Sequence, residues 1–230
     1  MSPNTHIIVT IDGPAASGKS TTARMVAERK GWLYLDTGAM YRAMAVKALR
    51  NGLSLDDPQA IARMADDIAI DLKTSGLGTR VYVDGEEVTQ AIRTPEVDQA
   101  VGPVCEVPRV REILVSLQRR IGDKGSLVAE GRDMGTVVFP DADLKFYMVA
   151  SIRSRAERRQ KDLEKQGIHL SLPELTDEIQ RRDRRDRSRS HSPLKPAEDA
   201  LRLDTSQLSI EEQVETVLKR IAEIEQRKSK

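Results

Sequence analysis

The ten residues DGPAASGKST, which begin at Asp12, restrict the fold of this chain more than any other stretch. A short apolar run rich in β-branched residues (6–12) precedes them, and a run of helix-forming composition (19–30) follows them and stops at Gly31. Strand, glycine-framed loop and helix start are the context that the pattern G-x-x-x-x-G-K-[ST], the Walker A motif, requires. The fixed positions of this pattern are Gly13, Gly18, Lys19 and Ser20.

The chemistry of the motif follows from its residue types. Gly13 and Gly18 can adopt turn conformations that let successive backbone N–H groups point at one anion, and the helix that begins near Lys19 adds its own N–H donors and dipole. Lys19 can reach the β- and γ-phosphates, and the hydroxyl of Ser20 can ligate Mg²⁺. The alternative is an ordinary glycine-rich turn. The strand and helix on either side favour a site for a nucleoside triphosphate.

The rest of the chain alternates between apolar runs and helical patterns. Strands are expected at 6–12, 32–35, 126–130, 144–149 and 201–204. Helices are expected at 19–30, 39–51, 57–67, 108–122, 151–166, 172–189 and 209–227. This order predicts an α/β fold, a parallel sheet with helices on both faces, whose ligands bind at the carboxyl ends of the strands.

One segment, 70–93, breaks this alternation. It carries a Gly-x-Gly turn at 76–78 and the pair Asp84-Gly85, which is a hairpin signal between short strands. We expect a small antiparallel insert here. The alternative is a surface meander without a function of its own.

Composition excludes several classes. The 230 residues hold 37 Lys and Arg against 36 Asp and Glu, which gives no overall electrostatic reason to bind nucleic acid or an anionic membrane. The single cysteine, Cys105, excludes an internal disulfide. No apolar stretch approaches the roughly 18 residues of a membrane span, and the N-terminus lacks the pattern of a signal peptide. A soluble, cytoplasmic protein is the expectation.

Arginines indicate which kind of triphosphate user this is. The guanine-reading pattern N-K-x-D is absent, which argues against a GTPase, whereas a kinase with an anionic acceptor needs several arginines for bidentate phosphate contacts. Arg42 and Arg132 follow strand ends, and the helical run 181–189 places Arg182, Asp186 and Arg189 on one face. The alternatives are solvated surface arginines, or an arginine-rich helix that docks RNA.

At this point the chain resembles a known family. The segments IDGPAASGKST, LDTGAMYR, IRTPEVDQAV, PRVR, EGRDMGTVVFPDADLKFY, RRDRRDRSR and LDTSQLSIEEQV resemble bacterial-type cytidylate kinases almost from end to end. The resemblance implies the adenylate-kinase-like P-loop fold. It implies a CORE domain at 1–64 and 101–230, a short lid at about 152–167, and an NMP-binding insert at 65–100 that closes over the CMP side.

The resemblance also assigns site residues. The ATP-binding residues it implies are Gly13, Pro14, Ala15, Ala16, Ser17, Gly18, Lys19, Ser20 and Thr21, with Arg158 of the lid reaching ATP. The CMP-binding residues it implies are Arg42, Arg132 and Arg189 for the phosphate, Arg111 and Asp133 for the cytosine, Arg182 and Asp186 for the ribose, and Thr37 nearby. Gly102 departs from the family pattern, because close relatives can carry a serine there that contacts cytosine.

The activity that the resemblance implies is transfer of the γ-phosphoryl group of ATP to CMP or dCMP, which gives ADP and (d)CDP. The catalytic residues would be Lys19, Arg132, Arg189 and Arg158, and Mg²⁺ would bind with ATP at Ser20. No general base is needed, since the acceptor oxygen is already anionic. We expect ATP and CMP or dCMP as the partners, no nucleic acid, no membrane, and a monomer. The alternative function is that of an ATP-binding protein whose arginine helix docks RNA.

Overall fold

The computed structural model describes residues 6–75, 78–165 and 167–229. The chain forms two compact units, one made of residues 1–34 and 126–230 and the other of residues 35–125. Gly76 of the expected Gly-x-Gly turn, and position 166 in the expected lid, lie outside the described residues.

The first unit is built on a five-stranded sheet with the order β2-β6-β1-β7-β8. Its strands are β1 (Ile8–Asp12), β2 (Leu33–Asp36), β6 (Leu127–Gly131), β7 (Leu144–Val149) and β8 (Leu201–Asp204). β1 pairs in parallel with β6 and β7, and β7 pairs in parallel with β8. Because β1 has neighbours on both sides, its residues are almost all buried, and the predicted parallel sheet is confirmed.

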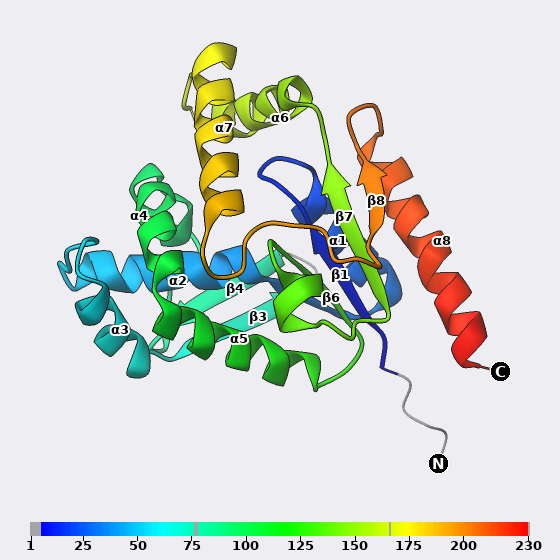
Figure 1. Cartoon of the computed structure of the whole chain (residues 1–230), viewed down its shortest axis with the longest axis horizontal. Helices are drawn as coiled ribbons and strands as arrows, with labels where there is room; N and C mark the ends of the chain where they lie inside the picture. The colour runs from blue at the N-terminus through cyan, green and yellow to red at the C-terminus, as the bar shows by residue number, and fades with distance from the viewer. Residues whose placement is uncertain (1–5, 76–77, 166, 230) are drawn as a thin grey trace. The chain divides into compact units, whose positions relative to one another are not determined.

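Helices α1 (Lys19–Lys30) and α8 (Ile210–Lys228) pack together against this sheet (Figure 1). Val26, Val214 and Val217 from the two helices join Val9 and Phe146 of the strands in one fully buried hydrophobic cluster. α8 starts with a capping box, in which Ser209 and Glu212 satisfy each other's backbone N–H groups. Local capping and apolar periodicity therefore place α8 behind the strand that carries the P-loop.

Two further helices and one long connection complete the first unit. Helix α6 (Ile152–Glu164) and helix α7 (Leu172–Ser188) pack on each other through Ala156, Leu175 and Ile179. The segment 189–200, orange in Figure 1, leads from the end of α7 across the strands to β8. A short π-helical turn, η2 (Met134–Val138), follows β6 directly.

The second unit holds the antiparallel sheet that the sequence predicts. Its strands are β3 (Ile70–Ser75), β4 (Gly78–Val83) and β5 (Glu86–Glu87), in the order β3-β4-β5. The turn between β4 and β5 is formed by Asp84 and Gly85, with φ of 52° and 84°. Two successive positive φ values are the geometry that makes Asp-Gly a hairpin signal.

The sequence did not predict one α-helix of the second unit, the one at Pro95–Glu106. The helices of this unit are α2 (Thr37–Arg50), α3 (Pro58–Asp66), η1 (Ala91–Arg93), α4 (Pro95–Glu106) and α5 (Pro108–Gly122). Pro95 suits the first turn of α4, where an N–H has no helical partner, and Thr94 caps that turn. Among the described residues, no helix is long and apolar enough to cross a membrane.

Candidate active site

The loop between β1 and α1 has the backbone that the Walker A pattern requires. A side chain on Gly13 would place its Cβ atom 2.3 Å from the carbonyl oxygen of Met148 on β7, so only glycine fits there. Gly18 has φ of 94° and Ala16 has φ of 57°, both in the left-handed region. A non-glycine residue in that region is uncommon, and such strain gathers where a loop must hold a ligand.

The first turn of α1 is free to receive an anion. Its N-cap is Gly18, which has no side chain to cap the helix, and no acidic residue stands in the first turn of this fully described helix. The N–H groups of that turn have no partner within the helix and carry the positive end of its dipole. This is the phosphate-binding arrangement expected from the sequence.

Glu130, the penultimate residue of β6, meets both functional side chains of the motif. The Ser20 hydroxyl donates to Glu130 Oε1 at 2.7 Å, and Lys19 Nζ lies 3.7 Å from Glu130 Oε2. Lys19 and Glu130 are both buried, and Lys19 also donates to the carbonyl oxygen of Pro14 at 3.4 Å. The lysine is thereby held over the loop with its charge balanced by a carboxylate.

These oxygens are suited to magnesium. Mg²⁺ prefers hard oxygen ligands and binds proteins through few side chains, since it keeps waters and takes the remaining ligands from phosphates. The Ser20 hydroxyl is exposed, and the Glu130 carboxylate is hydrogen-bonded to it. Among the described residues there is no group of three or more His, Cys, Asp or Glu that could hold a metal alone. The donor set therefore fits a cation that arrives together with a nucleotide.

Residues near the end of the chain support the P-loop from behind. The fully buried hydroxyl of Thr205, directly after β8, donates to the carbonyl oxygen of Ser17 at 2.8 Å. Arg158 of α6 donates to Thr205 Oγ1 at 3.1 Å and also to its carbonyl oxygen. In α1, Thr22 donates to the buried Gln213 of α8 at 2.9 Å. The C-terminal end of the loop and the first helical turns after it are thus tied to the residue that follows β8 and to α8.

A buried ion pair joins α6, the helix of the expected lid, and α7 to the same loop. Arg155 on α6 donates to Asp183 on α7 through two nitrogens, at 3.1 and 2.7 Å, and both side chains are 7% exposed. The guanidinium also donates to the carbonyl oxygen of Ala15 at 3.3 Å. Arg155 therefore contacts the P-loop, whereas Arg158, the expected lid contact with ATP, contacts Thr205.

In the first unit, one buried carboxylate, Asp186, holds two of the predicted phosphate-binding arginines. Asp186 accepts from Arg132 Nε at 2.8 Å through one oxygen and from Arg189 at 2.6 Å through the other. Burial would raise the pKa of Asp186, but Arg132 and Arg189, with Arg182 nearby, more than offset it, so the pKa lies below its ordinary value. The carboxylate stays ionised and fixes both guanidinium groups.

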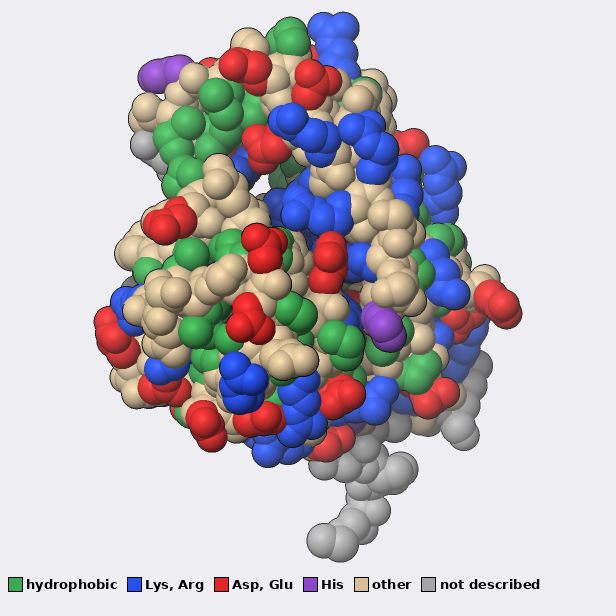
Figure 2. Space-filling model, turned by 60° about the vertical axis from the view of Figure 1, so that its left-hand side comes forward, with side chains coloured by type: hydrophobic (Ala, Val, Ile, Leu, Met, Phe, Trp, Pro, Cys, Tyr) green, Lys and Arg blue, Asp and Glu red, His purple; other side chains and the backbone are tan. Residues whose placement is uncertain are grey.

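This cluster belongs to a strongly basic region. On the face drawn in Figure 2, Lys and Arg side chains gather in the upper part, at the height of α6 and α7 in Figure 1. Arg182 is half-buried, while Arg184 and Arg187 on the same helix are exposed. Excess positive charge close to a phosphate-binding loop favours anionic substrates.

Of the remaining predicted CMP-binding residues, Asp133 precedes η2 in the first unit, and four others lie in the second unit. Arg42 on α2 pairs with Asp98 on α4 and donates to the carbonyl oxygen of Ile92 at 3.4 Å. Arg111, almost fully buried on α5, stacks over the ring of Tyr41 with 5.5 Å between guanidinium carbon and ring centre. Cation–π contact and burial fix its orientation. Two further positions are buried in helices: Thr37 opens α2, and Gly102 lies in α4.

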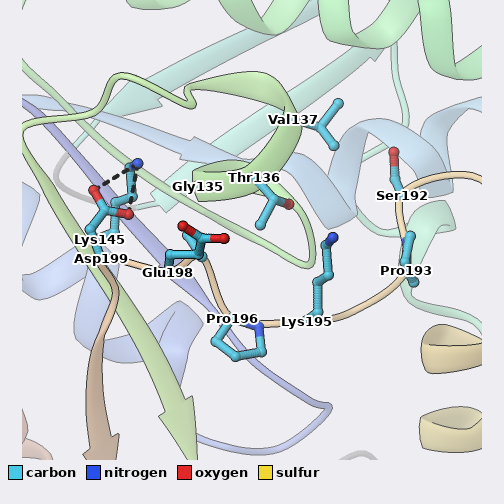
Figure 3. Close-up of a pocket in the computed structure, with 11 residues that line it drawn as sticks. Gly135, Thr136, Val137, Lys145, Ser192, Pro193, Lys195, Pro196, Glu198 and Asp199 are labelled. Carbon is cyan, nitrogen blue, oxygen red and sulfur yellow. Dashed lines mark hydrogen bonds and ion pairs between the residues drawn. The ribbon is translucent and has the colours of Figure 1, made fainter.

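A separate pocket of about 400 Å³ lies between η2 and the segment that leads to β8 (Figure 3). Lys145 and Asp199 form an ion pair at one end of it, at 2.9 Å, and Lys195 reaches into it from the opposite end. Gly135 and Thr136 of η2 form another wall.

Sequence reasoning missed the supporting residues. Arg155, Asp183, Thr205 and Gln213 had no role in the sequence analysis, although Thr205 and Gln213 fall within the family-like segment LDTSQLSIEEQV. The one available signal is an ionisable or amide side chain at a helix position that should face the core. Such groups are buried only when they have partners.

A parallel sheet with a phosphate-binding loop after its first strand, together with a lysine, a magnesium-type donor set and paired arginines, defines a P-loop kinase. The fold resembles that of an uncharacterized protein from Eubacterium ventriosum, with a TM-score of 0.52 and 12% identity over 94% of this chain and 99% of that one. The model of the cytidylate kinase family matches residues 9–223, and the chain belongs to that family.

Individual relatives agree with this membership. The chain is 46% identical to a cytidylate kinase from Pelotomaculum thermopropionicum over 215 residues, 93% of this chain and 95% of that protein. It is 45% identical to a cytidylate kinase from Pseudomonas syringae pv. tomato over 94% of this chain and 95% of that protein. It is also 51% identical to a bifunctional pantoate ligase/cytidylate kinase from Synechococcus sp. over 90% of this chain, which spans only 39% of that longer protein.

Proposed function

We propose that this protein transfers the γ-phosphoryl group of ATP to CMP or dCMP. Membership of the cytidylate kinase family supports the reaction. The observation on the molecule that carries the proposal is the pair of guanidinium groups of Arg132 and Arg189 held on the buried carboxylate of Asp186. Two fixed cations match the oxygens of a phosphate monoester better than a lone arginine does.

Catalysis in this proposal comes from position and charge. Phosphoryl transfer passes through a loose transition state whose charge spreads over the moving group, so fixed cations lower its energy. Lys19 stands over the P-loop, and Arg132 and Arg189 would hold the acceptor phosphate. The attacking oxygen belongs to a phosphate that is anionic at neutral pH, so this chain need not remove a proton from it.

We propose that Mg²⁺ enters with ATP and is held on the protein by Ser20, with Glu130 as its hydrogen-bonded neighbour. When bound, the ion would neutralise charge on the β- and γ-phosphates. The backbone N–H groups between Gly13 and Thr21 would bind the phosphates themselves. Arg158 is proposed to contribute from α6, although its observed partner is Thr205.

Recognition of the nucleoside is proposed as the resemblance implies. Arg42 would add to the phosphate contacts, and Thr37 would lie near the nucleotide. Arg111 and Asp133 would contact cytosine, and Gly102 has no side chain to add a contact. Arg182 and Asp186 would meet the ribose, and Asp186 has a second role, since both of its oxygens already accept from arginines.

The test is ADP release by the purified protein with ATP, Mg²⁺ and a panel of monophosphates. We expect rapid turnover with CMP and dCMP and weaker turnover with UMP and AMP. Arg189→Ala should lower kcat/KM for CMP and dCMP, whereas Arg184→Ala on the same helix should not, because that arginine is exposed and lies outside the Asp186 cluster. Equal turnover with all four monophosphates would contradict the proposed specificity.

The RNA-docking alternative finds no support in the family match. Three further expectations stay proposals, each with its own check. A monomer is tested by sedimentation, the absence of nucleic-acid binding by titration with a generic RNA at two salt concentrations, and a cytoplasmic location by fractionation.

A further inference from the structure

Asp12, the last residue of β1, is a buried carboxylate that the proposed reaction does not use. It is 4% exposed and stands directly before Gly13, the first residue of the P-loop. Its Oδ1 accepts from the backbone N–H of Met134 at 2.9 Å, and its Oδ2 accepts from that of Gly135 at 2.8 Å. One side chain thus binds two successive amides more than a hundred positions further along the chain.

These two amides open the turn η2, where they have no helical acceptor. The first N–H groups of any helical turn lack partners inside it, and Asp133, the N-cap of η2, makes no side-chain cap. The later N–H groups of η2 do have an acceptor in the turn, since Val137 and Val138 donate to the carbonyl oxygen of Asp133, at 2.9 and 3.2 Å. Asp12 therefore supplies from β1 the cap that the local sequence does not.

The close approach of η2 to the sheet leaves this turn little freedom. A Cβ atom on Gly135 would lie 3.0 Å from Thr10 Oγ1 and 3.2 Å from Lys145. The strand register places Asp12 opposite Gly131. Three residues lie between Gly131 and Gly135, and they include Arg132 and Asp133. The turn that carries them is therefore fixed at both ends to Asp12 of β1.

We propose that Asp12 is a positioning residue that fixes the turn Gly131–Gly135, and with it Arg132, to the strand that carries the P-loop. The inference rests on the proposed function for the role of Arg132 toward the CMP phosphate. In this proposal, Asp12 aligns the acceptor CMP with the phosphoryl donor ATP. A misplacement of about 1 Å in such a site costs on the order of 10²-fold in rate.

Protonation offers a way to observe this role without mutation. Burial, partly offset by the Gly135 and Met134 amides, raises the pKa of Asp12 to about 7. The charged or titratable groups that face it are Asp133 and Arg132 in the turn, and Tyr147 opposite on β7. Above this pKa both oxygens accept; below it one oxygen carries a proton that opposes an amide N–H. The two amides lower the pKa of Asp12, so the closed turn favours the ionised form as long as the carboxyl stays buried. Under that condition the turn should loosen as the pH falls.

The experiment compares wild type, Asp12→Asn and the matched control Thr10→Val on the same strand. Thr10 also faces Gly135, but its hydroxyl has no hydrogen-bond partner among the described residues, so its loss should change little. Amide exchange and the NMR shifts of Met134 and Gly135 report the turn, and kcat/KM for CMP and KM for ATP report the reaction, all from pH 6 to 9.

For Asp12→Asn we expect faster exchange at both amides and kcat/KM for CMP lower by about 10²-fold, with KM for ATP nearly unchanged. In wild type, the two amide shifts should titrate near pH 7 together with kcat/KM for CMP, and this component should vanish in Asp12→Asn. The second ionisation of CMP itself affects both proteins equally, so the difference between them isolates Asp12.

Wild-type exchange and CMP kinetics in Asp12→Asn would overturn the inference. Faster exchange with unchanged CMP kinetics would also overturn it, because the turn would then not govern the acceptor. Wild-type protein that fails to phosphorylate CMP would instead refute the proposed function. If Asp12→Asn does not fold, Asp12→Glu takes its place, because it keeps the carboxylate but displaces it by one methylene. Unchanged exchange at Met134 and Gly135, or unchanged kcat/KM for CMP, in Asp12→Glu would then overturn the inference.

Discussion

Asp186→Asn is the change that most directly tests the arginine cluster. Asp186 is 3% exposed, while the side chains of Arg132 and Arg189 are 16% and 10% exposed. Asparagine keeps the size of the side chain but offers a single acceptor oxygen, and its NH₂ group opposes the second guanidinium. One arginine therefore loses its partner at a site that water reaches poorly.

The expected magnitude follows from this geometry. A hydrogen bond between charged groups contributes roughly 1.5–3 kcal/mol, which corresponds to a loss of about 10- to 150-fold in kcat/KM. Because both arginines are proposed to hold the phosphate, CMP and dCMP should both lose activity, and KM for ATP should stay constant. CMP should lose more than dCMP, since Asp186 is also proposed to meet the ribose. Removing one member of a buried ion pair should also lower the free energy of unfolding by about 3–5 kcal/mol.

The pH dependence has a definite sign. The pKa of Asp186 is lower in the folded protein than its ordinary value, so its ion pairs stabilise the fold at neutral pH. This stabilisation is lost as the pH falls below about 4 and through the folded pKa. The difference in unfolding free energy between wild type and Asp186→Asn should therefore be largest at neutral pH and shrink in acid.

The assays are ADP release with CMP and with dCMP, and chemical denaturation at several pH values. Asp177→Asn is the matched control, because Asp177 is an exposed carboxylate on the same helix. A loss on CMP with little loss on dCMP would refute the reasoning and favour contact of Asp186 with the ribose alone.

Three further predictions concern the P-loop. Lys19→Ala should fold normally and lose about 10²-fold or more in turnover, because the lysine neutralises charge that grows in the transition state; near-normal turnover would exclude it as a catalytic group. Thr205→Val should raise KM for ATP about 5-fold through the lost hydrogen bond to Ser17, with KM for CMP unchanged; a shift confined to CMP would contradict this. Asp183→Ala should destabilise the protein by about 3–5 kcal/mol in urea unfolding, since it strands the buried guanidinium of Arg155; a loss under 1 kcal/mol would mean that water reaches this pair.

Local patterns predicted most of the fold. The strands and helices of the parallel sheet lie close to their expected positions, because capping residues, β-branched runs and Asp-Gly act over a few neighbours. Helix α4 was missed, because Pro95, Gly102 and Pro103 together indicate a broken segment. Pro95 is harmless at the first turn, and buried residues such as Val97 and Val104 stabilise the helix through packing that the local pattern does not reveal.

The features of the site fall into the same two groups, those that local sequence predicts and those that it does not. The phosphate-binding loop could be predicted, since one contiguous motif forms it. Its supports could not be, because Thr205 and Ser17 are 188 positions apart, and Thr22 and Gln213 are 191 apart. Such partners meet only when the sheet has folded. In the sequence they are polar residues for which no local pattern indicates a partner.

The support of the P-loop by Thr205 and Gln213 has a consequence for synthesis on the ribosome. The loop is translated almost two hundred residues before its partners, Thr205 after β8 and Gln213 on α8. Chains grow at about 5–20 residues per second, so the nascent loop waits roughly 10–40 seconds without them. A chain stopped before Thr205 should therefore bind ATP poorly, and nucleotide capture should begin only when the last strand and helix have left the exit tunnel.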